Sequence, residues 1–135
     1  MVESLYFGII SIRNFEVYLI MYKEGVYFAD ITRHQEDTDY KVRAISRLLF
    51  PILAQLKIPI NSYADVGCGS GGVIKAMKEK LGMEGFKVKD IQGFDVSPHV
   101  SQLKEEGIVF KMEDFTTHGE LMDLVTLTDV FEHVP

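Results

Sequence analysis

The sequence predicts an α/β fold in which a parallel sheet of four strands is flanked by helices. Two observations lead to this prediction. From residue 62 onward, short apolar segments alternate with longer helical segments, and strands that alternate with helices form βαβ units with right-handed crossovers. The chain has 135 residues, of which 47% are hydrophobic and 25% charged, as expected for one globular domain with a single core.

The first part of the chain has a different composition. Residues 4–31 are rich in Tyr, Phe, Ile and Val, with candidate turns at Arg13-Asn14 and Glu24-Gly25. This composition favours two or three short strands, and an amphipathic helix is the alternative. We therefore divide the chain into a β-rich or mixed N-terminal extension, residues 1–36, and a main domain, residues 37–135.

A helix is predicted at the start of the main domain. Apolar residues recur there at spacings of three and four, which places them on one helix face: Val42, Ile45, Leu49, Ile52 and Leu56. Asp37 or Thr38 is suited to cap this helix. Because Pro51 lacks an amide and clashes with the preceding turn, we expect a regular helix to Phe50 and an irregular chain beyond it.

Strands and helices then alternate. The segment SYADVG is a strand, GVIKAMKEKLG a helix with Gly82 as its C-cap, and DIQGFDV a second strand. The segment SPHVSQLKEEG is a second helix, with Ser97 as N-cap, Pro98 at its first position and Gly107 at its end. IVFKM and LMDLVTLTDVF are the third and fourth strands.

Charge and cysteine content exclude several classes of protein. A formal net charge of −6 provides no broad attraction to nucleic acid or anionic lipid, but it does not exclude a local basic patch such as Lys41, Arg43 and Arg47. The single cysteine, Cys68, excludes an internal disulfide and a cysteine-ligated zinc site. No segment approaches the roughly 20 uncharged residues of a spanning helix, and no cleavable leader precedes the domain. We expect a cytoplasmic protein without membrane or nucleic-acid partners.

Each predicted strand ends near a carboxylate. In an open parallel sheet, ligands bind beyond the carboxyl ends of the strands. Carboxylates at these ends suit ribose hydroxyls, an amino group or a cation, and they do not suit phosphates. The residues concerned are Asp65, Asp95, Glu113, Asp114 and Asp129.

The loop after the first of these strands, ADVGCGSGG, is dense in glycine. Gly67, Gly69 and Gly72 satisfy the pattern G-x-G-x-x-G of dinucleotide sites, while Gly67, Gly69 and Gly71 satisfy G-x-G-x-G. Either pattern places backbone amides and a helix N-terminus against an anion. A turn that serves only strand-to-helix packing is the alternative. Asp95, at the end of the second strand, is suited to accept from both ribose hydroxyls of either kind of cofactor.

Four segments together resemble the class I S-adenosylmethionine-dependent methyltransferases. They are DVGCGSGG, IQGFDVS, FKMEDF and MDLVTLTDVFEHVP, in the family's order over residues 63–135. The resemblance implies a Rossmann-like domain with strand order 3-2-1-4-5-7-6, of which only the strands 3-2-1-4 are found here. It also implies an in-line displacement that moves the sulfonium methyl of S-adenosylmethionine to an unidentified acceptor, most simply a small molecule, and leaves S-adenosylhomocysteine.

The resemblance further implies which residues bind the cofactor. Asp65 would lie near the methionine ammonium, Asp95 would hold the ribose hydroxyls, and Asp114 with Phe115 would contact adenine. The backbone from Gly67 would pass close to the methionyl and ribose groups. The full implied set is Asp65, Gly67, Cys68, Gly69, Gly71, Asp95, Val96, Glu113, Asp114, Phe115 and Asp129. Cys68 has no redox or nucleophilic role in this prediction.

The histidines add no firm site. In some methyltransferases a pair like Glu132 and His133 lies at the acceptor site as a base or metal ligand, and the alternative is that both begin the next helix or loop. We predict no metal site and name no catalytic residue. His34 and His118 are expected at the surface or in a loop, and His99 on an exposed helix.

The strands that would follow the fourth strand in this family are not found in the sequence. The fourth strand, Leu124–Thr128, would therefore be an exposed apolar edge of the sheet. We expect either the β-rich segment before residue 32 or a second copy of the chain to cover it, and the chain to be a fragment whose C-terminal strands are missing. Two other functions remain open. One is a non-catalytic cofactor-binding or interaction module, and the other is a NAD-dependent oxidoreductase, supported by the glycine pattern alone.

Overall fold

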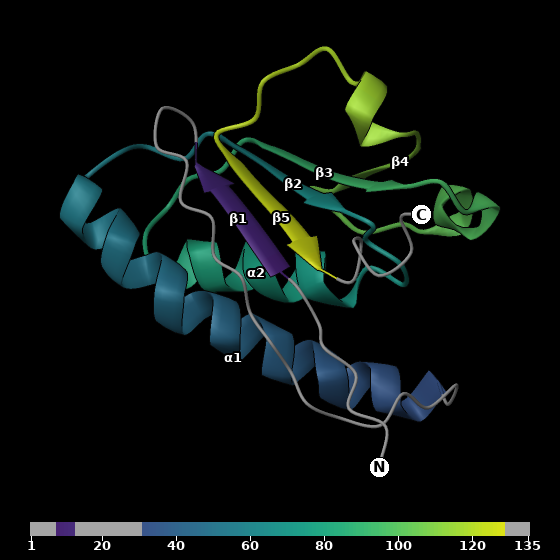
Figure 1. Ribbon diagram of the computed structural model, residues 1–135, viewed down its shortest axis with the longest axis horizontal. Coiled ribbons are helices and arrows are strands. Elements are labelled where there is room, and N and C mark those ends of the chain that lie inside the picture. Colours follow the sequence, from purple (N-terminus) through teal and green to yellow (C-terminus); the bar gives the residue numbers. More distant parts are fainter. Residues whose placement is uncertain (1–7, 13–30, 129–135) are drawn as a thin grey trace.

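The computed structural model describes residues 8–12 and 31–128 of the chain. Within them lies a five-stranded sheet in the order β1-β5-β2-β3-β4 (Figure 1). The strands β2 (Ser62–Val66), β3 (Asp90–Asp95), β4 (Val109–Met112) and β5 (Leu124–Thr128) run parallel. Numbered among themselves, they stand in the order 3-2-1-4, which confirms the predicted α/β, Rossmann-like fold class.

The outer edge of β5 is paired within the chain. β1 (Gly8–Ile12) runs antiparallel to β5, from Gly8 opposite Thr128 to Ile12 opposite Leu124. Of the two expected covers for this edge, the N-terminal segment is the one in place. Self-association through the edge of β5 stays a prediction, and the candidate turns between residues 13 and 30 lie outside the described residues.

The first helix, α1 (Ile31–Leu56), begins before the predicted cap at Asp37 or Thr38. The predicted start of this helix is therefore wrong. The division of the chain at residue 37 falls inside α1, and the two-part organisation stays a prediction.

α1 also continues through Pro51, contrary to prediction. Proline removes one amide from the helix ladder, but Leu49 and Leu53 on either side of it are both buried in the same core, at 1% and 2% exposure. Their burial holds both halves of the helix against the sheet. The buried face after the proline consequently passes through Leu53 rather than the predicted Ile52. No helix in the described part of the chain combines the length and the apolar character needed to cross a membrane.

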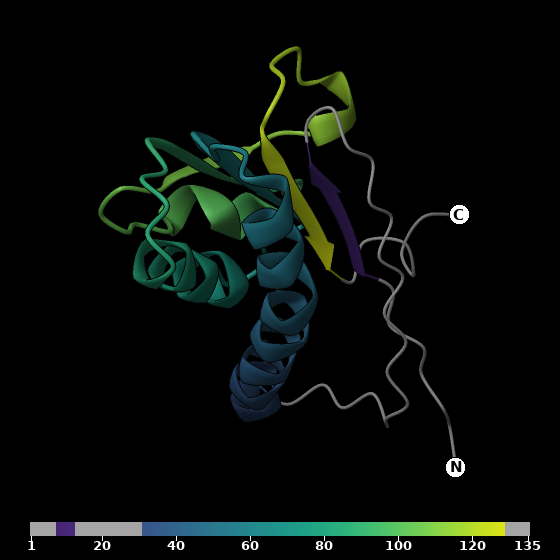
Figure 2. The same cartoon turned by 90° about the vertical axis from the view of Figure 1, so that its left-hand side faces the viewer.

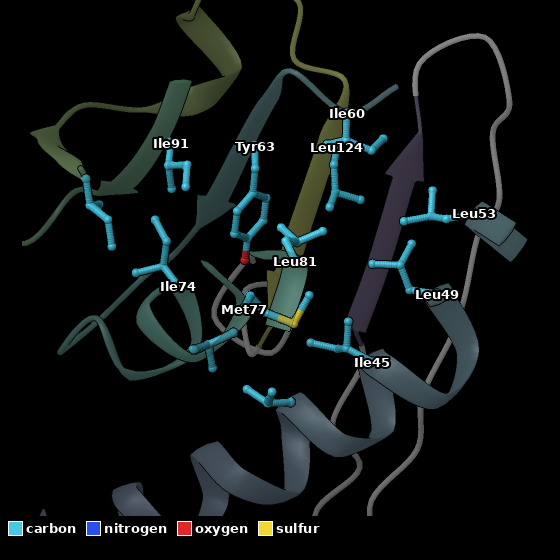
Figure 3. Close-up of a cluster of buried hydrophobic side chains, with 13 residues drawn as sticks. Ile45, Leu49, Leu53, Ile60, Tyr63, Ile74, Met77, Leu81, Ile91 and Leu124 are labelled. Carbon is cyan, nitrogen blue, oxygen red and sulfur yellow. The ribbon is translucent and has the colours of Figure 1, made fainter. Parts of the chain in front are cut away.

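Both helices cover the same face of the sheet, as Figures 1 and 2 show. The main core lies between α1, α2 (Gly72–Met83) and this face, and Figure 3 shows side chains from all three meeting there. Tyr63 and Leu124 project from the sheet, Met77 and Leu81 from α2, and Ile45 from α1. The opposite face carries a smaller buried cluster: Ala64, Phe94, Met122 and Val125.

α2 (Gly72–Met83) ends in a different way from the prediction. Gly82 lies inside the helix and is not its C-cap. The left-handed residue is Gly85, with a φ of 87°. The amide of Gly85 donates to the carbonyl of Gly82 at 3.1 Å, and the amide of Phe86 donates to that of Leu81 at 2.9 Å. These two bonds form a Schellman motif, which satisfies carbonyls that the helix end would leave open.

The predicted helix over residues 97–107 is reduced to one 3-10 turn, η1 (Pro98–Gln102). Ser97 makes no side-chain cap to it. The Ser97 hydroxyl instead contacts the ring of His99, with 2.7 Å between Oγ and Nδ1. The expected side-chain cap is therefore missing, because the hydroxyl is engaged by a neighbouring side chain.

The chain beyond η1 is held by α2 rather than by its own helix. Lys78 donates to the carbonyl of Glu106, and Lys75 pairs with Glu105 at 3.5 Å. Gly107, with a φ of 78°, then turns the chain into β4. Contacts from α2 therefore replace the helical hydrogen bonds expected here.

Asp123 connects the starts of β2 and β5, at the opposite end from the carboxylates of interest. Its Oδ2 accepts from the amides of Asn61 and Ser62 at 2.9 and 3.2 Å, and its own amide donates to the Ser62 hydroxyl at 2.8 Å. This acidic residue of the fourth motif thus has a structural role in the pairing of the two strands.

The way in which α2 ends predicts opposite effects on stability for alanine at two neighbouring glycines. No atom lies within 4 Å of a Cβ built on Gly82 or on Gly85, so only backbone conformation distinguishes the two positions. Gly85→Ala should lower the free energy of unfolding by about 1–2 kcal/mol, because alanine is strained at positive φ. Gly82→Ala should raise it by about 0.5–1 kcal/mol, because alanine favours a helix interior. Urea denaturation followed by circular dichroism measures both, and equal effects would contradict the Schellman ending.

Candidate functional site

Acidic residues from neighbouring strands meet at the carboxyl edge of the parallel sheet. Asp65 lies on β2, Asp95 ends β3, and Glu113 with Asp114 follows β4. The amide of Glu113 donates to the carbonyl of Asp95 at 3.1 Å, which joins the last two strand ends directly. The remaining predicted residue, Asp129, lies outside the described residues, as do Glu132 and His133.

The glycine loop between β2 and α2 is fastened to the end of β3. The amides of Gly67 and Cys68 both donate to the carbonyl of Phe94, at 2.8 and 3.0 Å. The amide of Gly69 donates to Asp95 Oδ2 at 2.9 Å, and that of Gly71 to the Cys68 carbonyl at 2.9 Å. Four amides of the loop therefore already serve hydrogen bonds within the protein.

The glycines of the loop are required for different structural reasons. A Cβ on Gly71 would lie 3.3 Å from the ring of Phe110, and one on Gly72 would lie 2.7 Å from the hydroxyl of Thr38. These two glycines make room for side chains of β4 and α1. No atom lies within 4 Å of a Cβ built on Gly69, whose φ is 53°. Gly69 is thus the point at which the loop turns an open face outward.

Asp95 is organised by two backbone amides. Oδ2 accepts from Gly69 and Oδ1 from the amide of Ser97, at 2.9 and 2.8 Å. Each carboxylate oxygen has a second lone pair for a further donor. The side chain is half-buried and its neighbour Val96 is 74% exposed. The carboxylate is therefore fixed in direction beside an accessible apolar surface.

Asp65 belongs to a buried chain of hydrogen bonds. Thr126 donates its hydroxyl proton to Asp65 Oδ1 at 2.7 Å, so the Tyr63 hydroxyl, 2.8 Å from Thr126 Oγ1, donates in turn to Thr126. All three residues have 0% exposure. Burial, and then the nearby charge of Asp65, raise the pKa of Tyr63 well above its usual value. Tyr63 thus stays protonated and remains a donor.

Cys68 is buried against the middle of the sheet. Its Sγ lies 3.2 Å from the position of a Cβ on Gly93. Burial, followed by the charges of Asp65 and Asp95, raises the pKa of the Cys68 thiol to about 12. A neutral thiol is a poor nucleophile, so the environment gives Cys68 no chemical role.

The end of β4 presents one exposed and two partly buried side chains. Asp114 is exposed, while Glu113 and Phe115 are intermediate. The Phe115 ring packs edge-on against Phe94, with centroids 5.1 Å apart, and stacks on His118 at 5.5 Å. Phe115 therefore uses its ring in the smaller core.

His118 lies in a loop, one of the two predicted locations, but its side chain is buried there. Its side chain is only 6% exposed, and Nδ1 lies 3.3 Å from Glu113 Oε1. This packing fixes the loop that follows β4. Within residues 8–12 and 31–128, no three His, Cys, Asp or Glu side chains are grouped so as to hold a metal ion.

Three residues at or beneath the site were not predicted. Thr126 stands opposite Asp65 in the β2–β5 register, and Tyr63 lies two residues before Asp65 on the same sheet face. The alternation of side chains along each strand, taken with the order of the strands, would indicate that Tyr63 and Thr126 lie beside Asp65. His99 donates from Nε2 to the carbonyl of Gly69 at 2.8 Å, and no sequence pattern indicates a bond from a side chain to a distant backbone carbonyl.

Comparison with known proteins identifies a family and a similar solved structure. Residues 33–135 match the family model described as "Methyltransferase domain". The structure of magnesium protoporphyrin IX methyltransferase from Synechocystis PCC 6803 with bound SAH is similar, with 18% identity and a TM-score of 0.38. That match covers 73% of this chain and 46% of the other, so this chain spans less than half of that protein's length. No curated protein matches the chain.

The buried hydrogen-bond chain predicts a stability difference at Thr126. Thr126→Val should lower the free energy of unfolding by about 2–3 kcal/mol, because it leaves a buried carboxylate and a buried phenol each short of one bond. Thr126→Ser keeps the hydroxyl and should cost about 1 kcal/mol, for the lost methyl group. Urea denaturation compares the two, and a larger loss for serine would contradict the network.

The environment of Cys68 predicts an inert thiol. With the pKa raised from 9.0 to about 12, the thiolate fraction at pH 8 falls about a thousandfold, and alkylation by iodoacetamide should slow at least as much. The unfolded thiol ionises near pH 9.0 and the folded one near 12. Its contribution to stability is therefore complete below pH 9 and is lost as the pH rises toward 12. Mass spectrometry in buffer and in urea measures the rates, and equal rates would contradict this.

Proposed function

The chain belongs to the methyltransferase domain family, and we propose that its carboxyl-edge site binds S-adenosylmethionine for methyl transfer to an acceptor that is still unidentified. The observation that carries the proposal is the position of Asp95. Its carboxylate is held by the Gly69 and Ser97 amides beside the open face of Gly69. A vicinal diol needs two acceptor lone pairs that point the same way, and this carboxylate supplies them.

Other residues suit the remaining parts of the cofactor. Val96 and Met112 are exposed apolar side chains at the ends of β3 and β4, 74% and 58% exposed, and they offer a surface for adenine. Asp114 is exposed beyond them for the exocyclic amino group. Asp65 is fully buried, so we assign it to the methionyl ammonium through its charge beneath the loop rather than through direct contact.

The loop favours S-adenosylmethionine over a dinucleotide. A pyrophosphate site uses the free amides of a glycine loop. Here the amides of Gly67, Cys68, Gly69 and Gly71 already donate within the protein. A doubly negative pyrophosphate would find these donors already engaged. A methionyl sulfonium carries no such charge.

The chemistry asks little of the side chains beyond alignment. S-adenosylmethionine supplies an activated methyl group on its sulfonium. The protein must hold ribose and adenine so that the methyl faces the acceptor in line, and must exclude water from that path. Asp95, Val96 and Asp114 fix the nucleoside. The residues after β5, which include Asp129, lie outside the described part, and we assign no base to the reaction.

Calorimetric titration of the 135-residue chain with S-adenosylhomocysteine tests the cofactor assignment. The wild type should bind, and Asp95→Ala should bind about 100-fold more weakly, because it loses two charge-assisted hydrogen bonds of about 1.5 kcal/mol each. Asp90→Asn is the matched control. Asp90 is an acid at the other end of β3, where it accepts from Gln92, and its substitution should leave affinity unchanged.

Three results would contradict the proposal in different ways. A folded wild-type chain that does not bind S-adenosylhomocysteine would exclude the site. Selective binding of NAD would support an oxidoreductase instead. Binding without turnover of any acceptor in a panel of O, N, C and S nucleophiles would support a binding module.

A further inference from the structure

Four hydrogen bonds join Asp95, Gly69, His99 and Ser97 into a closed ring. Asp95 accepts from the amides of Gly69 and Ser97, at 2.9 and 2.8 Å. His99 contacts the same two residues on their other polar groups, with 2.8 Å from Nε2 to the Gly69 carbonyl and 2.7 Å from Nδ1 to the Ser97 hydroxyl. The ring ties the glycine loop to the segment that follows β3.

The chemistry of the acceptor fixes the roles in this ring. A backbone carbonyl can only accept, so Nε2 of His99 carries a proton and donates to Gly69. In the neutral imidazole, Nδ1 then accepts from the Ser97 hydroxyl. Because that hydroxyl can rotate, Ser97 can also accept when Nδ1 carries a proton. The contact to Gly69 is therefore kept in either state of the ring.

Two hydrogen bonds hold the backbone of Gly69, one on each side of its Cα. The residue has no side chain, its φ is 53°, and no atom lies within 4 Å of where a Cβ would stand. No side chain at Gly69 therefore restrains the two peptide units that meet at its Cα, and glycine has wide backbone freedom. The amide of one unit is held by Asp95 and the carbonyl of the next by His99. Because the two units share the Gly69 Cα, loss of either bond lets one unit rotate and disturbs the other.

We propose that His99 is a positioning residue for the cofactor site. By holding the Gly69 carbonyl, His99 keeps the Gly69 amide on Asp95 and so keeps the carboxylate directed toward the ribose position. This inference rests on the proposed function of Asp95. His99 is exposed and lies outside both hydrophobic clusters, so its effect acts on ligand affinity and not on the stability of the core.

The test is S-adenosylhomocysteine affinity in His99 variants of the full 135-residue chain. His99→Ala should weaken binding about tenfold, the effect of one hydrogen bond lost from the ring. His99→Gln places an amide donor near the position of Nε2 and should restore affinity to within about threefold of the wild type. Ser101→Ala is the matched control, because Ser101 donates its hydroxyl to the Pro98 carbonyl within the same 3-10 turn. Thermal unfolding should be the same for all four chains.

A double-mutant cycle separates positioning from a general effect. If His99 acts through Gly69 and Asp95, His99→Ala should weaken binding by less than about twofold in a chain that already carries Asp95→Ala. An unchanged affinity in His99→Ala, or a full tenfold loss in both backgrounds, would overturn the inference. Absence of binding by the wild type would instead contradict the proposed function itself, so the two failures are distinguishable.

Discussion

The carbonyl of Phe94 accepts two hydrogen bonds, and the geometry of the carboxyl edge depends on them. The donors are the amides of Gly67 and Cys68, the first residues after β2. β2 and β3 are adjacent parallel strands. This pair of hydrogen bonds therefore fixes the point along β3 at which the chain leaves β2 and passes over the neighbouring strand. The position of Gly69 against Asp95, and the start of α2, follow from that exit.

Steric exclusion then limits what the loop can contact. The ring of Phe110 lies against two glycines, Gly71 of the loop and Gly93 of β3, at 3.3 and 2.9 Å from their built Cβ positions. Thr38 of α1 fills the corresponding space at Gly72. A dense glycine motif thus serves the protein's own packing as much as a ligand. Gly69 retains an unfilled side, and the polar contacts of the site gather around it.

The sheet could be predicted from the sequence because its signals are local. Each of the four parallel strands is a short apolar segment, and the alternation of these segments with helical ones indicates parallel pairing. The order 3-2-1-4 is expected from the resemblance to the class I methyltransferases. The ends of α1 and α2 could not be predicted as well. Burial of Leu49 and Leu53 outweighs the break expected at Pro51, and Gly85 rather than Gly82 takes the left-handed conformation.

Some residues of the candidate site could likewise be predicted from the sequence, and others could not. Its carboxylates are found at strand ends, where the order of strands and loops alone places them. Thr126 and His99 escape prediction because each acts through a partner more than twenty residues away, Asp65 in one case and Gly69 in the other. Such bonds require the register of the folded sheet and the path of a loop, and neither is present in a local pattern.

The pairing of β1 with β5 has a consequence for folding. More than a hundred residues separate Ile12 from its partner Leu124, so this pair closes a long loop and has a high contact order. The parallel strands and α2 are connected over much shorter distances. We therefore expect β1 to join last, after the core has formed. Until then β5 presents an apolar edge, and the concentration of the folding chain decides whether β1 or another molecule pairs with it first.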